Sequence, residues 1–73
     1  MNSINFNIAD RRVNLIVHDD GYDGPAFRVI AMKNRSMAIP FARFKHFKDA
    51  VAYRDKYSAY YPFVKFFIHR TLF

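Results

Sequence analysis

The spacing of apolar residues predicts one amphipathic helix within residues 44–61. Only in this stretch do apolar positions recur every three to four residues, which is the period of an α-helix. Asp49 falls in the first turn, where a negative charge suits the helix dipole, and Pro62 ends the pattern. We therefore predict a helix over residues 47–60. Its inward face is expected to contain Phe47, Ala50, Val51, Tyr57, Ser58 and Tyr61.

The first half of the chain shows the alternation of β-strands. Residues 3–8 alternate strictly between polar and apolar, and residues 13–18 are rich in β-branched and aliphatic side chains. Residues 9–12 make these two runs a hairpin if they form a tight turn, or one long bent strand if they only bulge. Residues 18–25 contain both glycines, a proline and three Asp, a composition typical of a loop. The spacing of these Asp residues does not match that of a calcium-binding loop.

Two further runs, residues 26–33 and 37–44, flank a turn signal at residues 34–36 and predict a second hairpin. Pro40 has no N–H to donate to a neighbouring strand, so the strand that contains it lies at an edge or is interrupted there. Residues 63–70 follow the helix and have the composition of a strand. The sequence contains no repeat or linker, so we treat residues 1–73 as one domain.

These elements predict a small α+β fold in the order β-β-β-β-α-β. The mainly antiparallel sheet has three to five strands, and the helix packs on one of its faces. Alternation along the strands then divides their residues into two sets. The inward set is Val13, Leu15, Val17, Phe27, Val29, Ala31, Ala42, Phe44, Val64, Phe66 and Ile68. The outward set is Asn14, Ile16, His18, Arg28, Ile30, Met32, Phe41, Arg43, Lys45, Phe63, Lys65, Phe67 and His69.

Composition supports a small, dense domain. The 73 residues include nine Phe and five Tyr, which bury large areas, and no Cys. Disulfides and thiolate metal sites are therefore excluded. Small secreted domains usually need disulfides, so this composition favours a cytoplasmic protein. We expect neither a membrane span nor a signal peptide, because no apolar run is long enough and the N-terminus lacks a basic stretch.

The charge of the chain is strongly positive and unevenly placed. Twelve Lys and Arg oppose six Asp, which gives a formal net charge of +6. From Gly24 onward there are ten basic residues and only two acids, Asp49 and Asp55. Such a basic segment favours a polyanionic partner, either nucleic acid or an acidic protein surface. A solvated surface that keeps the protein soluble is the simpler explanation.

The expected outward face combines aromatic and basic side chains, which leads to two hypotheses of function. In the first, Phe41, Phe63 and Phe67 stack on bases of single-stranded RNA or DNA. The phosphates would be neutralised by Arg28, Arg43, Lys45 and Lys65. In the alternative, the face binds a protein, through homodimerisation or capture of an acidic partner. A phage or mobile-element accessory protein that inhibits a host factor would have this character, although no motif indicates it.

Two features of the helix also carry candidate binding residues. Arg54 falls near the centre of the apolar face, where a buried charge needs a partner. It is expected to extend past the sheet edge or to pair with Asp20 or Asp23; otherwise it contacts a binding partner. Tyr53 and Tyr57 form a ridge with Tyr60, and such a ridge either packs on the strands or contacts a partner.

The sequence argues against an enzyme. Acid–base catalysis needs titratable groups gathered in a pocket, whereas the three histidines, His18, His46 and His69, are scattered. His18 and His69 are both expected on the outward face, but two imidazoles without a third ligand make a poor zinc site. We therefore expect no catalytic residues, no metal, no cofactor and no small-molecule substrate.

Overall fold

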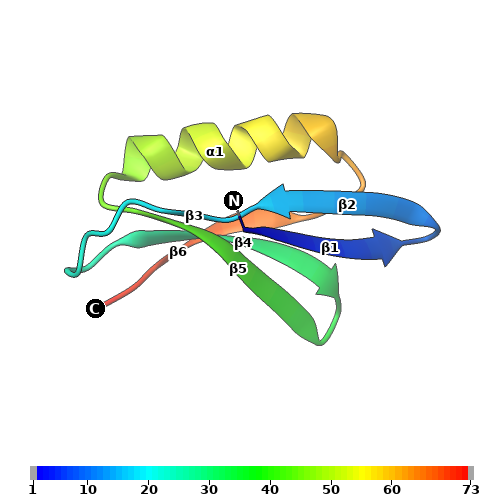
Figure 1. The fold of residues 1–73 in the computed structure, drawn as a ribbon, viewed down its shortest axis with the longest axis horizontal. Helices are drawn as coiled ribbons and strands as arrows, with labels where there is room; N and C mark the ends of the chain where they lie inside the picture. Colours follow the sequence, from blue (N-terminus) through cyan, green and yellow to red (C-terminus); the bar gives the residue numbers. More distant parts are fainter. Residues whose placement is uncertain (1, 73) are drawn as a thin grey trace.

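The computed structural model describes residues 2–72 and contains one helix packed on a mainly antiparallel sheet (Figure 1). The predicted α+β class is confirmed, with one short additional strand. The elements in chain order are β1 (Ser3–Ile8), β2 (Arg11–Ile16), β3 (His18–Asp19), β4 (Phe27–Asn34), β5 (Met37–Phe44), α1 (Phe47–Tyr60) and β6 (Phe66–Arg70). The helix within this described part of the chain is too short and too polar to cross a membrane.

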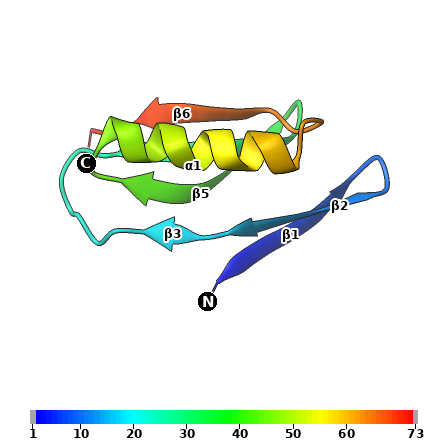
Figure 2. The same cartoon turned by 90° about the horizontal axis from the view of Figure 1, so that it is seen from above.

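The strands form a two-stranded hairpin and a four-stranded sheet. β1 and β2 pair antiparallel around a tight turn at Ala9 and Asp10, whose φ angles are 48° and 65°. The hairpin alternative for residues 3–18 is therefore correct, since two consecutive residues with positive φ are the signature of a type I′ hairpin turn. The second sheet has the order β3-β5-β4-β6, and its β3–β5 pair is parallel. Seen from above, the hairpin lies beside β3 and β6 lies at the opposite side (Figure 2).

The helix begins and ends where the periodicity predicts. His46 occupies the N-cap position without a side-chain capping hydrogen bond, which agrees with the absence of Ser, Thr, Asp or Asn there. At the other end, the Tyr61 N–H donates to the carbonyl of Tyr57 before Pro62. α1 lies over one face of the four-stranded sheet, and no helix or strand within residues 2–72 covers the other face (Figures 1 and 2).

The buried face of the helix is rotated relative to the prediction. Ala50 and Tyr57 are buried as expected, but Phe47 is 53% exposed, so its expected place in the core is wrong. Phe47 makes an edge-on contact with Phe27, at 5.3 Å between ring centres. The rotation turns Tyr53 toward the sheet, where its ring lies 5.3 Å from that of Phe44. The tyrosine ridge thus replaces the first-turn phenylalanine as the packing surface.

This rotation also moves Arg54 to the rim of the helix–sheet contact. The Arg54 guanidinium pairs with the neighbouring Asp55 at 3.2 Å, and its side chain is 34% exposed. The expected pairing with Asp20 or Asp23 is therefore wrong. Exposure at the rim removes the need for a partner from the acidic loop, because water solvates the charge.

A β-bulge in β5 reverses the expected facing of Phe41. The register passes from Val29↔Ala42 to Ile30↔Pro40, so Phe41 has no partner on β4. Phe41 and Ala42 consequently both point to the helix, and Phe41 is only 2% exposed. Its ring lies 5.3 Å from that of Tyr57. The expected place of Phe41 on the outward face is wrong, because the extra residue of a bulge changes the alternation of the strand beyond it.

The remaining core follows the predicted inward set closely. Among the described residues, the buried cluster combines side chains of the hairpin, the four-stranded sheet and the helix. It contains Phe6, Val13, Leu15, Val29, Ala31, Phe41, Ala42, Phe44, Ala50, Tyr57 and Val64. Phe27, Phe66 and Ile68 pack against this cluster while half-buried. The core is therefore largely aromatic, as the composition predicts.

Candidate binding surface

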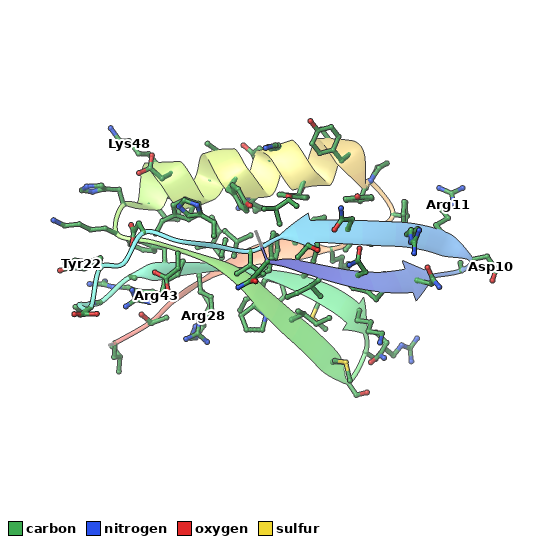
Figure 3. The ribbon with its side chains drawn as sticks, viewed as in Figure 1. Asp10, Arg11, Tyr22, Arg28, Arg43 and Lys48 are labelled. Atoms are coloured by element: carbon green, nitrogen blue, oxygen red, sulfur yellow. The ribbon has the colours of Figure 1, made fainter. Side chains whose placement is uncertain are left out.

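The uncovered face of the four-stranded sheet carries a row of charged side chains. Cross-strand partners share one face of a sheet, and the register aligns Asp19 of β3, Arg43 of β5, Arg28 of β4 and His69 of β6. Arg28 and Arg43 point away from the helix (Figure 3). Among these four positions two are arginine, so the row is cationic.

An apolar row lies directly beside the charged one. Pro40, Ile30 and Phe67 are cross-strand partners on the same face. Ile30 is only 9% exposed although no helix covers it, and Phe67 is 40% exposed. Met32 is the next outward residue of β4 and lies half-buried beyond Ile30. The face therefore has an apolar centre next to a cationic row.

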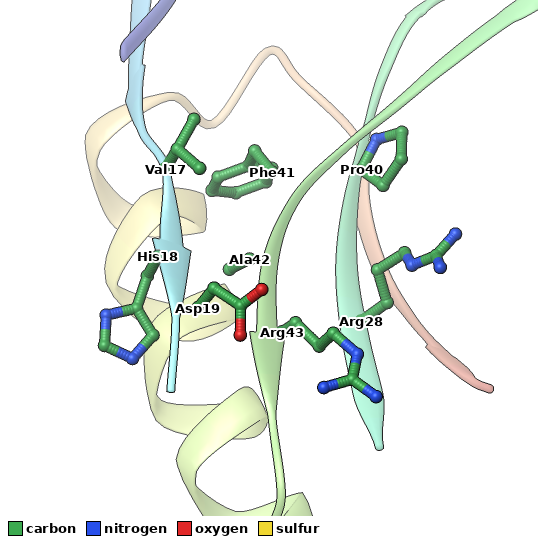
Figure 4. A pocket seen from close by; sticks show the side chains of 8 residues that line it. All are labelled: Val17, His18, Asp19, Arg28, Pro40, Phe41, Ala42 and Arg43. Carbon is green, nitrogen blue, oxygen red and sulfur yellow. The ribbon is translucent and has the colours of Figure 1, made fainter. Parts of the chain in front are cut away.

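An open groove of about 340 Å³ crosses this face between β3 and β5 (Figure 4). It exists because β3 pairs with β5 at only two positions, and the bulge after Pro40 bends β5 away from the preceding chain. Arg28 and Arg43 both line it, and their side chains point in different directions (Figure 4). Its lining consists of Val17, His18, Asp19, Arg28, Pro40, Phe41, Ala42 and Arg43.

Two of the expected phosphate-binding cations also hold the acidic loop in place. The Arg43 guanidinium donates to the carbonyl oxygens of Tyr22 and Gly24, the latter at 2.6 Å. The ammonium of Lys45 lies 4.9 Å from the centre of the Tyr22 ring, a cation–π contact. These contacts fix residues 20–25 at the edge of the sheet. Arg43 and Lys45 are therefore structural residues in addition to candidate contacts.

Asp20 anchors the same loop from its own side chain. Its two carboxylate oxygens accept the N–H of Lys45 at 2.7 Å and the N–H of Tyr22 at 3.1 Å. These hydrogen bonds, that of Lys45 first, lower the pKa of the Asp20 carboxyl below its ordinary value of 3.8. The carboxylate thus accepts hydrogen bonds from backbone N–H groups and forms no ion pair with a described basic side chain.

The structure brings together some of the sequence-predicted site residues and separates others. Arg28, Arg43 and Phe67 share the uncovered face, with Lys45 at its margin next to the loop. Lys65 directly precedes β6, where its carbonyl accepts the N–H of Met32. Tyr53 and Tyr57 lie instead between the helix and the sheet, as do the rings around Phe41. Arg54 belongs to the helix rim. The uncovered face therefore carries part of the expected basic set and fewer aromatic rings than expected.

Two further residues of the expected outward face are placed elsewhere. Phe63 is half-buried against the core, and the Arg11 guanidinium lies 5.0 Å from the centre of its ring. His18 stacks on Phe44 at 4.6 Å on the helix side of the sheet, so its expected place beside His69 is wrong. β3 pairs His18 with the inward-facing Ala42, which fixes this orientation.

Two site residues that the sequence did not single out are Pro40 and Asp19. Pro40 contributes to the apolar row and Asp19 to the charged row. For Pro40, the sequence did indicate an interrupted strand. Nothing in the sequence predicts the two-residue strand β3, which aligns Asp19 with Arg43. Within residues 2–72 no cluster of three or more His, Cys, Asp or Glu has the geometry to hold a metal ion.

Comparisons of the chain with protein-family models, with curated proteins and with solved structures found no match.

Proposed function

We propose that the protein binds nucleic acid through the uncovered face of its four-stranded sheet. The observation that carries this proposal is the cross-strand row in which Arg43, Arg28 and His69 lie side by side, with Lys65 just before the start of β6. Several basic or imidazole side chains close together on one face form the kind of positive patch that contacts a phosphate backbone. Asp19 is the one acid in the row, and it lies at the end.

The binding mode that this face favours is led by phosphate contacts. Single-strand binders usually offer several aromatic rings on which successive bases stack. Here Phe41 is in the core and Phe63 is half-buried, which leaves Phe67 as the exposed ring of the row. We therefore expect binding that depends strongly on salt and weakly on base sequence.

The test compares two double variants with equal net charge. Arg28→Gln with Lys65→Gln removes two cations from the proposed face, whereas Arg12→Gln with Lys48→Gln removes two exposed cations from β2 and the helix. Affinity for a labelled single-stranded oligonucleotide is measured by fluorescence anisotropy at several salt concentrations. The first variant is expected to flatten the log–log salt slope by about 1.4, or about 0.7 per lost phosphate contact.

The control variant is expected to leave that slope nearly unchanged. Equal effects of the two variants would show that only net charge matters, and the proposal for this face would be wrong. The same measurements with a duplex of equal length distinguish single-strand from duplex binding.

A protein partner is the second candidate, favoured by the exposure of Phe67 beside Ile30 and Pro40. An apolar centre with arginine nearby is typical of protein interfaces. The partner would be an acidic surface, such as a host factor blocked by a small accessory protein, or a second copy of this chain. Analytical ultracentrifugation at low and high salt tests the second copy, because a dimer buried on this face would hide Phe67.

A further inference from the structure

Two arginines oppose each other in the middle of the uncovered face. Arg28 of β4 and Arg43 of β5 are cross-strand partners, and both line the groove (Figure 4). Like charges directly opposite each other on neighbouring strands destabilise a sheet. Both residues are half-buried, so solvent and salt screen their repulsion less than at a fully exposed site. An anion between them would remove this repulsion.

The two guanidinium groups differ in how they are held. Arg43 donates to the loop carbonyls of Tyr22 and Gly24, which fixes its position, and three of its five N–H donors remain for a ligand. Arg28 makes no hydrogen bond or ion pair with any side chain of residues 2–72, so all five of its donors are available. The groove thus combines one fixed and one adjustable guanidinium.

The charge of the groove favours anions. Asp19 is its one carboxylate; it accepts the Gly21 N–H at 2.8 Å and forms no ion pair with either arginine. Two guanidinium groups and one carboxylate leave one net positive charge. A phosphodiester carries one negative charge, which this net charge balances. We infer that the groove binds one phosphodiester of a nucleic-acid strand between Arg28 and Arg43.

This inference rests on the proposed function and adds a position for the strand. The apolar row lies two residues farther along the strands, which is about 7 Å from the arginine row. A base next to the bound phosphodiester therefore reaches Pro40, Ile30 and Phe67. The phosphate is held by charge and the base by apolar contact.

The experiment titrates the protein with thymidylyl-thymidine, which has one phosphodiester and no terminal phosphate. Thymidine monophosphate and sulfate serve as comparison probes, and the Nε–H signals of Arg28 and Arg43 are followed by NMR. Thymidylyl-thymidine is expected to shift both signals at the lowest concentration of the three probes. Arg28→Gln is expected to weaken its binding about tenfold, because a charge-assisted contact is lost. The control Lys48→Gln, on the helix, is expected to have no effect.

A second variant tests the charge balance directly. Asp19→Asn keeps an oxygen for the Gly21 N–H and raises the net charge of the groove by one. It is expected to improve binding of thymidine monophosphate about fivefold more than binding of thymidylyl-thymidine, since the extra charge favours the more highly charged phosphate. Arg28→Gln is expected to melt at the same or a higher temperature than the wild type in phosphate-free buffer, because the repulsion is gone.

Several outcomes overturn the inference. These are equal shifts with sulfate, stronger binding of thymidine monophosphate than of thymidylyl-thymidine to the wild type, or no shift with any probe. A parallel titration with a long single-stranded oligonucleotide separates the two proposals. Salt-sensitive binding that Arg28→Gln leaves unchanged would overturn the groove site and leave the proposed function standing. No binding of the long oligonucleotide, despite binding of thymidylyl-thymidine, would overturn the proposed function instead.

Discussion

The hydroxyl of Tyr57 accepts a hydrogen bond from the backbone N–H of Ile16 at 3.0 Å, although 41 residues separate them in the chain. Tyr53 and Tyr61, one turn away on either side, continue this contact: Tyr53 donates to the Ile16 carbonyl at 2.5 Å, and Tyr61 bonds to both backbone groups of Asn14. Tyr53 and Tyr57 both contact Ile16, and the step of about 6 Å from Tyr57 to Tyr61 matches the two strand residues, about 6.7 Å, from Ile16 to Asn14. The tyrosine hydroxyls therefore satisfy backbone N–H and C=O groups at the edge of β2 that has no neighbouring strand.

Removal of the Tyr57 hydroxyl is expected to destabilise the protein. Tyr57→Phe keeps the buried ring but leaves the Ile16 N–H without its acceptor, at a cost of about 1–3 kcal/mol in the free energy of unfolding. Urea denaturation measures this difference. Tyr60→Phe is the matched control, because Tyr60 is 64% exposed and no described hydrogen bond involves its hydroxyl. Equal stability of both variants would show that the contact with β2 contributes nothing.

Alkaline pH is expected to weaken the fold through Tyr53. Burial, followed by its interaction with Tyr57, raises the pKa of the Tyr53 hydroxyl. An unfolded tyrosine ionises near pH 10, so above that pH the unfolded state has lost a proton that the folded state keeps. This contribution to stability is therefore complete below about pH 9 and declines above about pH 10. Chemical denaturation between pH 8 and pH 12 is expected to show a smaller decline for Tyr53→Phe than for the wild type.

Phe41 and Phe67 provide a test of the bulge. Phe41 is 2% exposed and Phe67 is 40% exposed. Phe41→Ala is expected to cost about 3–5 kcal/mol in the free energy of unfolding, which approaches the whole stability of a domain of this size. Phe67→Ala is expected to cost much less, because its ring is already partly in water. Thermal melts of both variants give the ranking, and a larger loss for Phe67→Ala would mean that the outward face of β5 is assigned wrongly.

The residues of the bulge show why the sequence predicted the fold better than the surface. Helix bounds, strand order along the chain and most inward positions follow from local periodicity. The facing of Phe41 depends on one unpaired residue, and Pro40 indicated an interruption without showing which side chains it would reverse. A single register shift therefore removed one ring from the expected binding face.

The rotation of the helix has a different origin. The apolar pattern placed the centre of the buried face near Arg54 and Phe47. This pattern treats tyrosine as an apolar ring and takes no account of the hydrogen bonds of its hydroxyl. The hydroxyls of Tyr53 and Tyr57 find acceptors and donors on β2, which lies about 40 residues earlier in the chain. Such a long-range polar contact leaves no local pattern, so the sequence alone could not predict it.

Acid is expected to loosen the loop next to the binding face. Hydrogen bonds from Lys45 and Tyr22 lower the pKa of Asp20, so its contribution to stability is present above the ordinary value of 3.8 and is lost as pH falls below it. Asp20→Asn is expected to lower the melting temperature at pH 7 and to show a smaller further loss between pH 4 and pH 2 than the wild type. Asp23→Asn is the control, since no described hydrogen bond involves its side chain. An equal fall in melting temperature between pH 4 and pH 2 for the wild type and Asp20→Asn would contradict this role.

Phe67 is the residue whose replacement best separates the two proposed functions. If the face binds nucleic acid, Phe67→Ala is expected to weaken binding by about 1–3 kcal/mol with little change in the salt slope, because stacking releases no counterions. Lys65→Ala is expected to flatten that slope by about 0.7 for a single strand. Phe67 lies near the start of β6 and Lys65 directly before it, so the two differ in chemistry more than in position.

If the face binds a protein, the ranking is reversed. Phe67 then acts as a buried anchor whose loss raises the dissociation rate, while Lys65 at the rim changes mainly the association rate. Stopped-flow measurements of both rates for the two variants distinguish these outcomes with whichever partner binds. A wild-type protein that shows no salt-sensitive binding to single-stranded or duplex nucleic acid at low ionic strength would exclude the first function, since a chain of net charge +6 that contacts phosphates must lose affinity as salt rises.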